Sequence, residues 1–109
     1  MSSMFYKLDE NKNAIPCSAK EWGDQREIMR RKKTKHVNDE MIDGKRISTV
    51  WLGLNHAIDD DSIKPLIFET MVFNEKDEIY CEQFSTWTEA EEGHKRAVEW
   101  VLNGCKEDE

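Results

Sequence analysis

The dipeptide Asp43-Gly44 is the feature that most constrains how this chain folds. Both central residues of a two-residue type I′ hairpin turn need a positive φ, which Asp and Gly tolerate. The segment that follows, Arg46–Leu54, is rich in β-branched and aromatic residues and is the strongest strand prediction in the chain. We therefore expect it to pair with a strand over Lys35–Met41 in an antiparallel hairpin.

Other strand-like segments flank this hairpin. Pro65 leads into an apolar run over Leu66–Phe73, and the polar residues 74–77 turn the chain back into a strand over Glu78–Phe84. Near the amino terminus, Met4–Leu8 reads as a strand that returns through Ile15-Pro16. The order of these segments predicts an antiparallel meander.

Two helices complete the pattern. Ser18 begins a capping box with Glu21, which predicts a helix over Ala19–Arg30. Either Thr86 or Thr88 caps a second helix that runs to about Asn103, where Gly104 is well placed to end it. We expect one α+β domain over residues 1–109, with an antiparallel sheet of four or five strands and two helices packed on one face.

Charge limits the classes of partner. Lys and Arg number 16 against 23 Asp and Glu, a net charge of −7, so we do not expect direct nucleic-acid binding. The acidity serves either solubility or attraction to a basic protein groove, and Asp59, Asp60 and Asp61 are the candidate contacts. The one basic run, 30–35, is either a solvated helix end or a contact surface for an acidic partner or a nucleic-acid backbone.

The chain has neither an apolar run long enough to cross a bilayer nor a signal peptide, so we expect a cytoplasmic protein without membrane contact. Its three cysteines lack regular spacing, which argues against a disulfide framework.

Three polar residues occupy positions where the periodicity predicts apolar ones, namely His56, Glu69 and His94. Two imidazoles and a carboxylate form a ligand set typical of zinc, and Cys17 is the candidate fourth ligand, with Cys81 next. Other interpretations stay open: Glu69 faces water, His94 is a half-buried histidine with a satisfied ring nitrogen, or His56 caps a loop.

Three sequence blocks resemble a widespread family of small phage and prophage proteins. They are Ser48–His56, Ile67–Phe73 and Thr86–His94, in the same order as in that family, although Asn55 replaces the usual aspartate. The chain is also similar to zinc-binding anti-CRISPR proteins of type II-A. This resemblance implies an inhibitor that binds a host CRISPR effector nuclease and hinders DNA loading.

The expected function is therefore that of a phage-derived, non-enzymatic inhibitor of a host defence nuclease, with a structural zinc ion that compensates for a small core. Two alternatives remain. A site with three protein ligands would leave room for an activated water and make the protein a metal-dependent hydrolase. A protein without metal would be a phage accessory protein.

Overall fold

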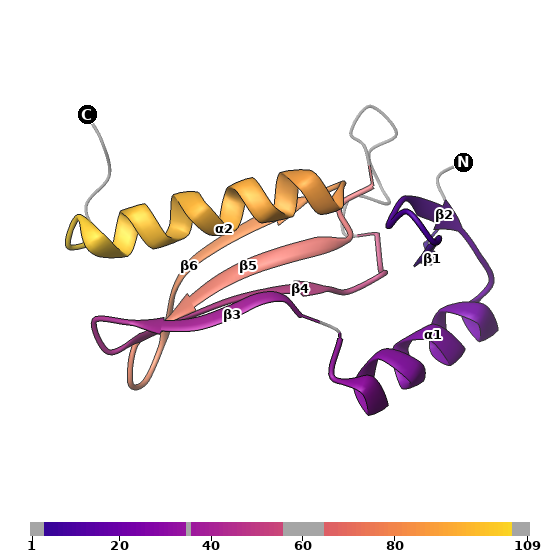
Figure 1. Cartoon of the computed structure of the whole chain (residues 1–109), viewed down its shortest axis with the longest axis horizontal. Helices are drawn as coiled ribbons and strands as arrows, with labels where there is room; N and C mark the ends of the chain where they lie inside the picture. The colour runs from indigo at the N-terminus through magenta and orange to yellow at the C-terminus, as the bar shows by residue number, and fades with distance from the viewer. Residues whose placement is uncertain (1–3, 35, 56–64, 106–109) are drawn as a thin grey trace.

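The computed structural model describes residues 4–34, 36–55 and 65–105, and it shows an α+β fold (Figure 1). The elements in chain order are β1 (Tyr6–Leu8), β2 (Ala14–Pro16), α1 (Ala19–Lys32), β3 (His36–Ile42), β4 (Lys45–Trp51), β5 (Phe68–Phe73), β6 (Glu78–Phe84) and α2 (Trp87–Leu102). Within these ranges, neither helix is both long enough and apolar enough to cross a bilayer.

Strands β3 to β6 form an antiparallel sheet in chain order, as the meander pattern predicted. The turn between β3 and β4 is the expected two-residue one, since Asp43 has φ 50° and Gly44 has φ 76°. β4 ends at Trp51 instead of Leu54, because Gly53 turns the backbone to φ 70°. A Cβ on Gly53 would also clash with the side chains of Trp51 and Trp22.

Helix α2 crosses one face of this sheet and closes the core (Figure 1). Its side chains Ala97 and Val101 pack on Ile47 and Val72, and all four are buried. Thr86 caps the helix by accepting a hydrogen bond from the backbone of Glu89, which settles the choice between the two candidate caps.

The strands β1 and β2 form a separate two-stranded sheet. It joins the larger sheet through a bridge between Phe5 and Leu54 and through the Tyr6 amide, which donates to the Gly53 carbonyl at 2.8 Å. We expected both helices on one face of a single sheet. Helix α2 covers that face, whereas α1 lies beside the end of the sheet and contacts β1 (Figure 1).

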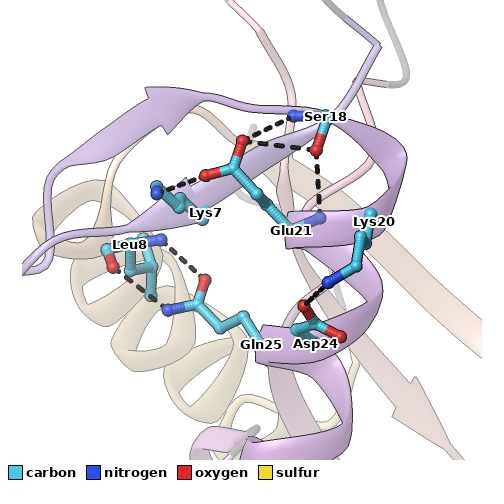
Figure 2. A network of polar contacts seen from close by, with 7 residues as sticks. All are labelled: Lys7, Leu8, Ser18, Lys20, Glu21, Asp24 and Gln25. Atoms are coloured by element: carbon cyan, nitrogen blue, oxygen red, sulfur yellow. Dashed lines mark hydrogen bonds and ion pairs between the residues drawn. The ribbon is translucent and has the colours of Figure 1, made fainter.

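Polar contacts fasten α1 to β1 (Figure 2). The capping box is present, since Ser18 accepts from the Glu21 amide while the Glu21 carboxylate accepts from the Ser18 amide. That carboxylate also pairs with Lys7 of β1 at 2.7 Å. One turn further, Gln25 accepts from the Leu8 amide at 2.7 Å and donates to the Leu8 carbonyl at 3.0 Å. Gln25 thus supplies the two backbone hydrogen bonds that a neighbouring strand would otherwise make.

Candidate functional site

His94 is the sequence-predicted site residue that the structure places most deeply. It lies on the inner face of α2, between the buried residues Ala90, Gly93 and Ala97, and is only 2% exposed. Gly93 lets the helix approach the sheet, because a Cβ there would clash with the ring of Phe84. The imidazole is therefore held against the sheet under the helix.

Both ring nitrogens of His94 have protein partners. Nδ1 lies 2.7 Å from the Thr49 hydroxyl of β4, and Nε2 lies 3.0 Å from the Glu40 carboxylate of β3. The Thr49 hydroxyl is also hydrogen-bonded to the Thr70 hydroxyl of β5. Four elements are thus joined by one polar chain, which we call the His94 network.

A single assignment of protons satisfies this chain with a neutral ring. Nε2–H donates to Glu40, the Thr49 hydroxyl donates to Nδ1, and the Thr70 hydroxyl donates to Thr49. A buried polar group is costly only when it lacks a partner. The network therefore lets α2 bury a histidine on its apolar stripe.

The carboxylate–imidazole–hydroxyl order of Glu40, His94 and Thr49 matches the order used in nucleophilic catalysis. Thr49, however, is fully buried beneath α2, so its hydroxyl is closed to a substrate. The hydrogen bonds from His94 to Thr49 and Glu40 instead hold α2 on the sheet.

Glu40 reaches His94 because it shares a face of β3 with Ile42, two residues along the strand. Strict alternation would put Val37 and Ile42 on opposite faces of the strand. Both pack against the core under α2, because the register shifts between His36 and Asn38. The bulge changes the face of Val37 but not that of Glu40, which alternation counted back from Ile42 places on the core face. Thr49 and Thr70 carried a usable signal, since each shares a face with apolar neighbours in its strand.

Glu69 does not meet His94. It is adjacent to Thr70 in β5, so its side chain points to the sheet face opposite α2. There its carboxylate accepts from the Gln83 amide at 3.1 Å. Glu69 and His94 therefore do not fit a shared zinc ion.

The two candidate thiols are also separated. Cys17 lies before α1, where burial and the nearby Glu21 raise the pKa of its thiol. Cys81 is in β6 on the Glu69 face, and burial, with Glu69 and Glu78, raises the pKa of its thiol to about 11.

His56 and the acidic positions Asp59, Asp60 and Asp61 lie outside the described residues, so their predicted roles stay predictions. Among the residues that the structure describes, no group of three or more His, Cys, Asp or Glu side chains is arranged to hold a metal ion.

Comparison of the chain with protein-family models, with curated proteins and with solved structures gave no match.

Proposed function

We propose that this protein is a protein-binding inhibitor that presents an acidic helix face to a basic, nucleic-acid-handling surface of a host nuclease. The observation that carries the proposal is the outer surface of α2. Glu91, Glu92 and Glu99 are all exposed there, on a helix whose inner side is fixed against the sheet. We call these three residues the α2 acidic face.

The charge distribution along α2 supports this role. The neighbouring cation Arg96 is paired with Glu82 of β6 at 3.1 Å, so part of its charge is neutralised within the protein. Lys95 is exposed one turn from both Glu91 and Glu99 and offsets one of the three negative charges, so the face keeps an excess of acid. In the described part of the chain, none of the three glutamates of the α2 acidic face forms an ion pair. Complementary charge steers a partner during encounter and raises the association rate.

The rigidity of α2 also favours recognition. The His94 network and the buried contacts of Ala97 and Val101 fix the helix on the sheet. A surface that is ordered before binding loses little conformational entropy on association.

The resemblance to phage proteins of the anti-CRISPR type supplies the partner: a host CRISPR effector nuclease in the host cytoplasm. In the proposed mechanism the α2 acidic face occupies basic surface on which the effector would hold DNA. The inhibitor acts by stoichiometric occupancy, and no chemical step is required.

The test is a DNA-loading assay with a purified type II-A effector carrying its guide RNA. We expect the bound fraction of target DNA to fall in proportion to added protein and to vanish near equimolar inhibitor. The protein mixed with DNA alone should give no shift. DNA loading that is unchanged in excess inhibitor would contradict the proposal.

A further inference from the structure

A groove runs between the carboxyl-terminal half of α1 and the β1–β2 hairpin, with a volume of about 630 Å³. Its floor is apolar, formed by Leu8, Ile28, Met29 and Trp87. Ile28 is half exposed, although a side chain of this kind gains free energy by burial. We call this hollow the hairpin groove.

The rim of the hairpin groove is basic. Lys12, Lys32 and Lys33 line it, and the adjoining hollow adds Arg30. Two carboxylates, Asp9 and Glu10, are also present. Arg30 is already paired with Glu27 at 2.6 Å, so the three lysines exceed the two acids by one charge, in a protein whose net charge is −7.

The two walls of the groove are held in place. Gln25 ties α1 to the backbone of Leu8, and Glu21 ties it to Lys7, as Figure 2 shows. On the opposite side, the Lys12 ammonium lies 4.2 Å from the centroid of the Trp87 ring. The groove therefore exists before a ligand arrives.

Two lysines of the groove are available to a ligand. In residues 4–34, 36–55 and 65–105, neither Lys32 nor Lys33 forms an ion pair. Of the two acids, Asp9 is committed to the hairpin turn, since its carboxylate accepts from the amides of Asn11 and Asn13 at 2.8 Å each.

Lys12 and Lys33 also adopt a backbone conformation that favours other residues. Their φ angles are 64° and 57°, in the left-handed region where glycine or asparagine is preferred. Lys33 ends α1 at the position where glycine is most common. The two walls thus each carry a lysine where glycine or asparagine would be less strained.

We propose that the hairpin groove binds an acidic, amphipathic peptide segment of a partner protein. Carboxylates of the segment pair with Lys12, Lys32 and Lys33, and an apolar side chain enters between Ile28 and Trp87. Charge complementarity selects an acidic ligand, and the apolar floor favours a peptide over a nucleic-acid backbone. This inference is independent of the proposed function, because the α2 acidic face is formed by other residues.

The probe is a fluorescein-labelled peptide of glutamates around one phenylalanine and one leucine, added to the full chain. Fluorescence anisotropy measures affinity, and amide chemical shifts locate the site. We expect saturable binding with shifts at Ile28, Lys33 and the Trp87 indole. A peptide with lysine in place of every glutamate should not bind.

Lys12→Asn with Lys33→Asn tests the two strained lysines without a risk to folding, because asparagine tolerates a positive φ. This double variant loses only the exposed Lys12–Trp87 contact, so its melting temperature should fall by no more than about 4–8 °C, and it should bind the acidic peptide about tenfold more weakly. Lys76→Gln with Lys95→Gln removes the same charge elsewhere and should bind like the wild type.

Equal affinity in the two double variants would overturn the proposal, as would acidic-peptide shifts that fall outside the groove or do not occur. Tighter binding of a single-stranded oligothymidylate in the groove would also overturn it, in favour of a nucleic-acid site.

Discussion

The replacement His94→Ala tests whether the His94 network fixes α2 on the sheet. The ring is 2% exposed, so its truncation removes buried contacts, at a cost of about 2 kcal/mol. The fully buried Thr49 hydroxyl loses one of its two partners, which adds about 1 kcal/mol. The loss of the Glu40 hydrogen bond adds little to this cost, because the carboxylate is 39% exposed and water can solvate it once the imidazole is gone. We expect a loss of about 3 kcal/mol in the free energy of unfolding.

Such a loss lowers the melting temperature of a domain this size by on the order of 15 °C. Urea titration followed by tryptophan fluorescence gives the free energy, and calorimetry gives the melting temperature. Glu40→Gln is the control, because its amide oxygen still accepts from Nε2. That variant should stay within about 1 kcal/mol of the wild type.

A double-mutant cycle with Thr49→Val isolates the hydrogen bond itself. Each single change breaks the same contact, so the double variant should be less destabilised than the sum, by about 1 kcal/mol. Additive effects, or a His94→Ala variant as stable as the wild type, would show that this hydrogen bond does not hold α2 on the sheet. Chelator should leave the wild-type melting temperature unchanged, since the network needs no metal. A chelator-induced fall would instead favour the predicted zinc ion.

Three further predictions concern packing, helix attachment and pH. Gly93→Ala should destabilise the protein by about 1–3 kcal/mol in urea titration, because the new methyl group meets the Phe84 ring. Gly23→Ala is the control: its methyl group has open space in α1, and the change should stabilise the protein by about 0.5–1 kcal/mol. Equal effects of the two changes on stability would contradict the packing of Gly93 against Phe84. Gln25→Leu leaves the Leu8 backbone without two hydrogen bonds and should speed hydrogen exchange in α1, while Asp24→Asn, which breaks only an exposed ion pair, should not. The hydrogen bond from Lys7 lowers the pKa of Glu21 from its ordinary 4.5. The stability that this pair contributes is therefore present above pH 4.5 and is lost as the pH falls through the lowered pKa. Lys7→Met should make the fall in stability with pH shallower in this range, and an unchanged pH profile would count against the pairing.

The fold follows closely from local signals in the sequence. Turns and helix caps each depend on a few neighbouring residues, and they lie at predicted positions. They are the turn Asp43-Gly44, the caps Ser18 and Thr86, and Gly104 after α2. The position of α1 depends on Gln25, which hydrogen-bonds the backbone of a strand seventeen positions away. No local pattern encodes such a contact, so the helix was placed on the sheet instead of beside it.

The candidate site was predictable only in part. Periodicity singled out His94 because an imidazole interrupts an apolar stripe, and the structure confirms that it is buried. Its partner Glu40 shares the core face with Ile42 by ordinary alternation, but β3 is mostly polar, so no apolar stripe pointed to this position. Glu69 was singled out by the apolar residues around it in β5, yet alternation puts it on the opposite face from His94.

The proposed function depends on the α2 acidic face as the surface that binds a basic partner. The direct measurement is the dissociation constant for the type II-A effector, by calorimetry, in two variants of equal net charge. One carries Glu91→Gln, Glu92→Gln and Glu99→Gln. The other carries Glu75→Gln and Asp77→Asn in the β5–β6 turn and Glu78→Gln at the start of β6. The account predicts weaker binding, by about tenfold or more, for the first variant and wild-type affinity for the second. Equal affinities would contradict it.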